Sequence, residues 1–222
     1  MKAMILAAGR GERMRPLTDH TPKPLLKVGG KPLIVWHIEN LAKAGFKKIV
    51  INHAHLGEQI ETALGDGATW GVRIQYSAEK IALETAGGIA NALNMLGAEP
   101  FLVVNGDVFT TIDFSGLTLA QAHLAHLVMV NNPPQHAQGD FVLENGKLKT
   151  EGAQKLTFSG VGVYHPDLFA GVARGEAAKL APLLNTAIAK GLVSAQHHTG
   201  AWYDIGTPQR LAELDALLKG QH

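Results

Sequence analysis

The sequence predicts an α/β protein with three layers, in which helices cover both faces of a mostly parallel sheet. In the first half, short apolar runs of the length of buried strands alternate with apolar stripes of helical period. Repeated strand–helix–strand units of this kind form parallel sheets with right-handed crossovers. The expected strands are 3–8, 48–52, 72–76 and 101–104, and the expected helices between them are 32–44, 56–64 and 85–96.

The second half of the chain is less regular and richer in expected strands. The turn residues Asn145-Gly146 lie between two alternating runs and predict a hairpin within 141–149. No internal repeat, low-complexity stretch or linker divides the chain. We therefore expect one domain over residues 1–222, with halves at 1–110 and 111–222. The further expected strands are 126–130, 156–164 and 193–197, and the further expected helices are 178–190 and 208–219.

The composition limits the classes of function. The 222 residues include 20 Lys and Arg against 19 Asp and Glu, which gives a formal net charge of +1. This balance gives no reason to expect a nucleic acid or an anionic membrane as a partner. The chain has no cysteine, and no apolar run approaches the roughly 18–20 residues of a membrane span. We expect a cytoplasmic protein that is a monomer or a weak homodimer.

The stretch from Met4 to Val28 holds the clearest functional signal. Its apolar start runs into Gly9 and Gly11, which let the backbone turn sharply and approach a ligand closely. Arg13, Arg15 and Lys23 then add cations near a loop that is rich in backbone N–H groups. Such a loop at the carboxyl end of a strand suits phosphate groups.

Two better-known phosphate motifs do not fit this stretch. A dinucleotide-binding fingerprint needs a further glycine where Met14 stands, and an acid at the end of the second strand, where Asn52 and His53 stand. The Gly-Lys-Ser/Thr of a nucleoside-triphosphatase loop is absent. From the glycines alone, a tight turn after the strand and a phosphate site both remain open.

The residues around the glycines are more specific. The segments 11–18 (Gly-Glu-Arg-Met-Arg-Pro-Leu-Thr) and 22–26 (Pro-Lys-Pro-Leu-Leu) resemble the signature of the sugar-phosphate nucleotidyltransferases, although Lys27 stands where proline is common. The resemblance implies a Rossmann-like sheet of the nucleotide-diphospho-sugar transferase type, with a small inserted β subregion for the sugar. It also implies that residues 1–110 bind the nucleotide, and that residues 111–222 bind the sugar and end in a helix.

In that family the glycine loop holds a nucleoside triphosphate. The resemblance makes Arg13 and Lys23 catalytic residues that contact its phosphates. Cations suit this role, since nucleotidyl transfer depends mainly on positioning and charge stabilisation. The segment 83–89 resembles the part that contacts the nucleobase, with Glu84 where glycine is common, and a plain helix start is the alternative. The resemblance implies these nucleotide-binding residues: Ala8, Gly9, Gly11, Glu12, Arg13, Lys23, Gly87, Gly88 and Asn105.

Two aspartates are candidates for a metal site. Asp107 follows Asn105-Gly106 just past an expected buried strand, and so faces the same crevice as the glycine loop. Mg²⁺ takes oxygen ligands and commonly bridges to substrate phosphates, whereas a turn-capping aspartate is the plainer alternative. The resemblance matches Asp107 to a catalytic metal ligand. The segment 202–207 resembles a late family element that makes Asp204 the second ligand; an acid near the last helix N-terminus is the alternative.

The acceptor side carries fewer signals. Asp140 lies where relatives contact the sugar, and Ser159 and Gly160 match a strand of small residues that approaches the sugar closely. Relatives usually carry Glu-Lys-Pro where this chain has Thr150-Glu151-Gly152. Glu151 is therefore the contact that the resemblance leaves in that segment.

Within this family, the motifs are most similar to enzymes that transfer a uridylyl group from UTP to N-acetylmuramate 1-phosphate. That likeness implies an Mg²⁺-dependent reaction that yields UDP-N-acetylmuramate and pyrophosphate during recycling of peptidoglycan sugars in the cell wall. Glucose, mannose or N-acetylglucosamine 1-phosphate, or phosphocholine, is the alternative acceptor. A non-catalytic nucleotide-sugar sensor is the alternative from another class, and it predicts a lost lysine or aspartate, whereas Lys23, Asp107 and Asp204 are present.

Overall fold

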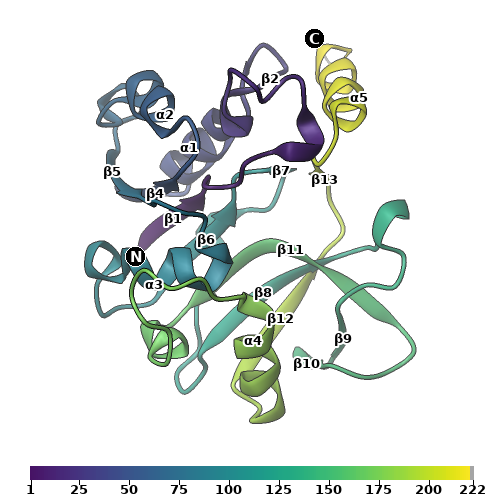
Figure 1. Cartoon of the computed structure of the whole chain (residues 1–222). Coiled ribbons are helices and arrows are strands. Elements are labelled where there is room, and N and C mark those ends of the chain that lie inside the picture. Colours follow the sequence, from purple (N-terminus) through teal and green to yellow (C-terminus); the bar gives the residue numbers. More distant parts are fainter. Residues whose placement is uncertain (221–222) are drawn as a thin grey trace.

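A computed structural model describes residues 1–220, and a nine-stranded sheet forms its centre (Figure 1). Its strands are β1 (Lys2–Leu6), β4 (Lys48–His53), β5 (Arg73–Ala78), β6 (Phe101–Asn105), β8 (Ala125–Val130), β9 (Phe141–Glu144), β10 (Lys147–Lys149), β11 (Lys155–Tyr164) and β12 (Val193–His198). They are ordered β5-β4-β1-β6-β11-β8-β12-β10-β9. The first four in that order are parallel, β11 runs antiparallel to both of its neighbours, and β12 is parallel to β8. The expected mostly parallel sheet is confirmed.

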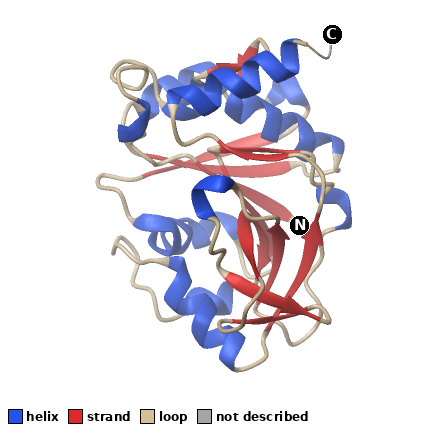
Figure 2. Cartoon of the chain, turned by 90° about the vertical axis from the view of Figure 1, so that its right-hand side faces the viewer, coloured by secondary structure: helices blue, strands red, loops and turns tan. Residues whose placement is uncertain are grey.

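Helices cover both faces of this sheet (Figure 2). They are α1 (Leu33–Lys43), α2 (Gly57–Leu64), α3 (Glu84–Leu96), α4 (Leu180–Ala189) and α5 (Pro208–Lys219). Neighbouring side chains of a strand point to opposite faces, so Ile5 of β1 packs with residues of α1 and α2, whereas Met4 packs with residues of α3 and α4. This alternation produces two apolar cores and confirms the three layers.

Helix α5 lies apart from these two cores and covers the N-terminal loop (Figure 1). Its buried Leu214 belongs to a third cluster with Met14, Val28 and Phe109. Thr207 caps its N-terminus, because the Thr207 hydroxyl accepts a hydrogen bond from the Arg210 backbone N–H at 3.3 Å. The last helix therefore holds the loop that follows β1 against the rest of the fold.

Most of the second half of the chain extends the same sheet through β8, β11 and β12. The expected hairpin is confirmed, since Asn145 and Gly146 adopt φ of 51° and 75° between β9 and β10. Two short pairs were not expected from the sequence: β2 (Lys27–Val28) with β3 (Lys31–Pro32), and β7 (Val108–Thr110) with β13 (Trp202–Asp204). None of the helices within residues 1–220 has the length and apolar character needed to cross a membrane.

Candidate active site

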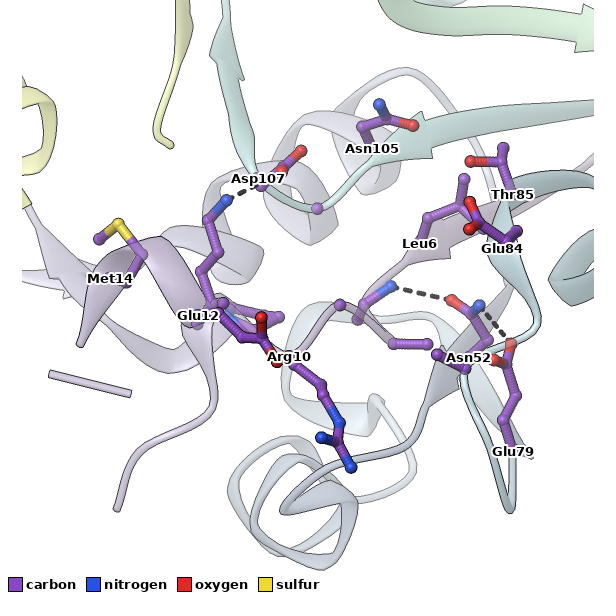
Figure 3. A pocket seen from close by; sticks show the side chains of 18 of the residues that line it. Leu6, Arg10, Glu12, Met14, Asn52, Glu79, Glu84, Thr85, Asn105 and Asp107 are labelled. Carbon is purple, nitrogen blue, oxygen red and sulfur yellow. Dashed lines mark hydrogen bonds and ion pairs between the residues drawn. The ribbon is translucent and has the colours of Figure 1, made fainter. Parts of the chain in front are cut away.

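A cleft of about 540 Å³ lies at the carboxyl ends of β1, β4 and β6 (Figure 3). This edge of an open α/β sheet is where ligands bind, because the loops there diverge and leave backbone groups exposed. The first strand ends at Leu6, two residues earlier than expected, because the Ala7 N–H turns to the side chain of Asn52. Of the nucleotide-binding residues expected from the sequence, those that line the cleft are Ala8, Gly9, Gly11, Glu12, Arg13, Lys23 and Asn105.

The two glycines of the loop differ in what they do. Gly11 has φ of 64°, and a methyl group there would lie 2.9 Å from Thr18 Cγ2 and 3.2 Å from Lys23 Cβ. Gly11 is therefore needed both for its backbone conformation and for the packing of the loop. A methyl group on Gly9 would meet no atom within 4 Å. The absence of a side chain at Gly9 instead leaves room in the cleft.

Lys23 and Asp107 form an ion pair inside the cleft. The Lys23 side chain is only 9% exposed, and its Nζ lies 2.8 Å from Asp107 Oδ2. A short 3₁₀ turn from Lys23 to Leu25, entered through Pro22, fixes the backbone of the lysine. Across the cleft, the Gly106 N–H donates to the Leu6 carbonyl at 2.8 Å, which holds Asp107 close to the end of β1.

The pair of strands β7 and β13 brings the second aspartate next to the first. Asp204 is in register with Val108, and the Ile205 N–H donates to the Asp107 carbonyl at 2.9 Å. The Asp204 carboxylate does not line the main cleft; it lines a second cavity, where Arg210 Nη1 lies 2.5 Å from its Oδ2. The backbone segments of the two expected metal ligands are thus hydrogen-bonded to each other, and each carboxylate has a cation beside it.

Asp107 offers the cleft carboxylate oxygens, the ligand type that Mg²⁺ prefers, whereas the Asp204 carboxylate lines the second cavity. Within residues 1–220, no group of three or more His, Cys, Asp or Glu side chains is arranged to hold a metal ion. Mg²⁺ does not need such a group, because it commonly binds through one or two carboxylates, substrate phosphates and water. Asp107 supplies one such carboxylate beside the glycine loop, and the backbone pairing of β7 with β13 keeps the Asp204 segment next to it.

A second polar cluster, for which the sequence predicts no role, forms the opposite wall of the cleft (Figure 3). The buried Asn52 side chain accepts from the Ala7 N–H at 2.8 Å and donates to Glu79 Oε1 at 2.7 Å. Glu79 Oε2 accepts from the Leu83 N–H at 3.1 Å. Burial raises the pKa of the Glu79 carboxyl, and these two hydrogen bonds oppose that rise. Polar residues just after buried strands were the signal that could have revealed the cluster.

The glycines of α3 serve this wall without lining the cleft themselves. A methyl group on Gly88 would lie 2.8 Å from both Asn52 Nδ2 and Glu79 Oε1, and one on Gly87 would lie 2.3 Å from the Glu176 carbonyl. Both positions therefore require glycine for close packing. Glu84 does line the cleft, and its φ of 59° is the left-handed conformation that favours glycine.

The residues expected to contact the sugar are only partly brought to the cleft. Gly160 has φ of 77°, and a methyl group there would lie 2.6 Å from the side chain of Asn105, which lines the cleft. Ser159 is fully buried beside it. Asp140 Oδ2 accepts from the Phe158 N–H at 2.8 Å and so fixes the start of β11. Glu151 is exposed in the bend between β10 and β11 and lines neither cavity.

The comparison with known families fits this geometry. A family model described as nucleotidyl transferase matches residues 2–220. The chain belongs to this family. It is 58% identical, over 98% of both chains, to the N-acetylmuramate alpha-1-phosphate uridylyltransferase of Neisseria meningitidis serogroup B. It is 32% identical to the protein of the same name from Caulobacter vibrioides, over 97% of this chain and 96% of that one.

More distant members of the nucleotidyltransferase family are also similar. The mannose-1-phosphate guanyltransferase beta-A of Xenopus laevis is 28% identical over 94% of this chain, which covers 62% of that protein. A crystal structure of a protein from Bacillus anthracis, assigned as a glucose-1-phosphate thymidylyltransferase and bound to sucrose, superposes with a TM-score of 0.86. The superposition covers 99% of this chain and 95% of that protein. Because the two sequences are only 23% identical, the likeness supports the fold alone.

The charges of this nucleotidyltransferase are unevenly distributed in the cleft. Arg10, Glu12 and Asp107 lie on one side, and Asn52 and Glu79 lie on the other (Figure 3). Among residues 1–220, neither Arg10 nor the Arg13 guanidinium takes part in a salt bridge. Cations without a carboxylate partner beside a glycine loop are suited to bind phosphate oxygens.

Proposed function

We propose that this nucleotidyltransferase transfers a uridylyl group from UTP to N-acetylmuramate 1-phosphate, releasing pyrophosphate and forming UDP-N-acetylmuramate. The observation that carries the chemistry is the ion pair between Lys23 and Asp107 at the carboxyl edge of the sheet. The full-length identity of 58% to a uridylyltransferase of that specificity supports the choice of base and sugar. The reaction would belong to the recycling of cell-wall sugars in the cytoplasm.

The donor nucleotide is proposed to occupy the cleft formed by the first half of the chain, residues 1–110. Its triphosphate lies along Gly9 and Gly11, where backbone N–H groups are available, with the Arg13 guanidinium facing the phosphate oxygens. Its base lies at the opposite wall, which Asn52 and Glu79 hold in place. Gly87 and Gly88 act by permitting the packing of that wall rather than by direct contact.

The reaction follows from this placement. A phosphate oxygen of the acceptor forms a bond to the α-phosphorus of the donor, the bond from that phosphorus to the bridging oxygen breaks, and pyrophosphate leaves with the electron pair. Lys23 and Arg13 stabilise the negative charge that spreads over the phosphates, and they act by position because nucleotidyl transfer needs little proton chemistry. Asp107 and Asp204 would hold Mg²⁺, which supplies further charge neutralisation when bound.

The acceptor is proposed to enter from the second cavity, which has a volume of about 620 Å³ and lies next to the main cleft at Asp204. Trp202 lines this cavity, and its indole N–H donates to the Ser159 carbonyl at 2.9 Å. The bulge at Ser159 and Gly160 in turn packs against Asn105, which lines the main cleft. Asp140 and Glu151 remain proposed sugar contacts on the same half of the chain, residues 111–222.

The proposal is tested by measuring pyrophosphate release over a matrix of nucleoside triphosphates and sugar 1-phosphates. UTP with N-acetylmuramate 1-phosphate should give the highest kcat/KM. Asp107→Asn should abolish this activity while the protein stays folded, and Asp113→Asn, the same change at an exposed aspartate that accepts only from Ser115, serves as the matched control. If another pair reacts best, the specificity is wrong. If no pair reacts, the proposed activity fails.

A further inference from the structure

Two arginine side chains from distant parts of the chain meet at Gly206. A methyl group on Gly206 would lie 2.8 Å from Arg210 Nη2 and 3.2 Å from Arg13 Nη2. Because both nitrogens lie so close to one point, the two Nη2 atoms are no more than about 6 Å apart. Two positive groups at that distance repel each other unless an anion or water lies between them. Gly206 itself lines the main cleft. The arginines therefore converge at the edge of the proposed phosphate site.

The hydrogen bonds of Arg210 leave one end of its guanidinium available. Nη1 contacts the Asp204 carboxylate and, at 3.2 Å, the Asp204 carbonyl. Nε lies 3.4 Å from the Thr207 hydroxyl. Nη2 makes no hydrogen bond to any of residues 1–220, and neither does the guanidinium of Arg13. The side chain of Arg210 is 21% exposed, so it is held in place yet accessible.

We propose that Arg210 is a substrate-binding residue of this enzyme, and that it forms a phosphate-binding pair with Arg13 across Gly206. Asp204 and Thr207 fix one side of its guanidinium, which directs the free Nη2 toward a phosphate oxygen. A planar guanidinium that is already oriented loses little entropy when it binds phosphate. The ligand is a phosphate group, either of the donor triphosphate or of the acceptor.

The composition of the second cavity supports this assignment. Among its lining residues within 1–220, Arg210 is the single lysine or arginine. An acceptor phosphate that approaches the main cleft through this cavity passes Asp204 and therefore needs a cation there to offset the repulsion. Arg210 is placed to be that cation.

The test measures binding without turnover. Pyrophosphate and N-acetylmuramate 1-phosphate are each titrated calorimetrically in EDTA against the wild type, Arg210→Gln and Arg210→Lys. Loss of one charge-assisted hydrogen bond should raise the Kd of the affected ligand about tenfold or more. Arg210→Lys should retain part of the affinity. Arg73→Gln is the matched control, because Arg73 is exposed at the opposite end of a parallel strand.

Each outcome has a definite meaning. Weaker pyrophosphate binding assigns Arg210 to the donor phosphates, and weaker binding of the sugar phosphate alone assigns it to the acceptor; KM for the same substrate should rise in parallel. An arginine that only anchors Asp204 would change the melting temperature and leave both affinities unchanged, which would overturn the proposal. So would a wild type that binds neither ligand. The inference rests on the proposed function for its sugar ligand, but the pyrophosphate titration is independent of base and sugar.

Discussion

Acid should destabilise this protein through the buried side chain of His37. His37 lies in α1, is 1% exposed, and is close enough to the Asp107 segment to sense its charge. Burial lowers the pKa of His37 from its ordinary value of 6.5 to about 4, against the opposing effects of the Val108 backbone and the Asp107 carboxylate. The folded protein therefore holds His37 neutral at pH values where the unfolded chain has already bound a proton.

The magnitude follows from the two pKa values. Above pH 6.5 neither state is protonated at His37, so the residue adds no pH dependence there. Between pH 6.5 and 4 the unfolded state binds the proton and the folded state does not, so stability falls as the pH falls. The full loss is about 3 kcal/mol, of which about 2 kcal/mol should have appeared by pH 5.

Urea unfolding at pH 7.5 and pH 5 measures this effect. The free energy of unfolding of the wild type should fall by about 2 kcal/mol more than that of His37→Leu, because leucine removes the titrating group and keeps a similar volume. Any constant cost of the substitution cancels in this difference. His55→Leu, at an exposed position, should keep the wild-type dependence. If His37→Leu shows the same loss as the wild type, His37 does not stay neutral in the folded state and the reasoning is refuted.

Three further substitutions test the cleft. Lys23→Ala should lower kcat for pyrophosphate release about 10²–10³-fold through loss of a preorganised contact, unlike the exposed Lys27→Ala; near-normal turnover would remove Lys23 from the mechanism. Glu84→Gly should raise the free energy of unfolding in urea by about 1 kcal/mol, because glycine tolerates φ of 59°; a loss of stability would contradict this. Gly88→Ala should cost about 1–3 kcal/mol of stability and raise KM for UTP, because its methyl group would press against Asn52 and Glu79. Gly116→Ala is the control, since a methyl group there meets nothing within 4 Å. Equal effects of the two substitutions would refute the packing argument.

Local sequence signals were sufficient for the sheet and for the glycine turn that follows its first strand. Apolar runs fix where strands form, and the left-handed backbone of Gly11 agrees with the sharp turn expected there. The proximity of Lys23 to Asp107 could be anticipated because both follow strands that end at the same edge of a parallel sheet. The helix boundaries differ from expectation by only a few residues, since side-chain caps and local turns decide the final residue.

The parts that could not be anticipated depend on contacts between distant residues. The β7–β13 pair is only three residues long, which is too short for a periodic signal. The Ile205 N–H extends it with a hydrogen bond to the Asp107 carbonyl, a contact between residues far apart in the sequence. The hydrogen bond from Asn52 to Glu79 joins residues at the ends of two different strands, and neither local sequence indicates which residue its partner is. The approach of Arg13 and Arg210 at Gly206 is of the same kind.

The antiparallel strand β11 explains how a second half with so few motifs can serve the same site. Its C-terminal part pairs with β6, with Val161 opposite Val104, so Gly160 falls at the carboxyl end of β6 beside Asn105. Its N-terminal part continues past that edge and pairs with the end of β8 and with β9. The second cavity lies at the ends of β8 and β12, which point in the same direction as β6. One edge of one sheet thus presents both cavities, and the β13 segment between them carries Asp204 and leads to Arg210, where donor and acceptor phosphates would have to meet.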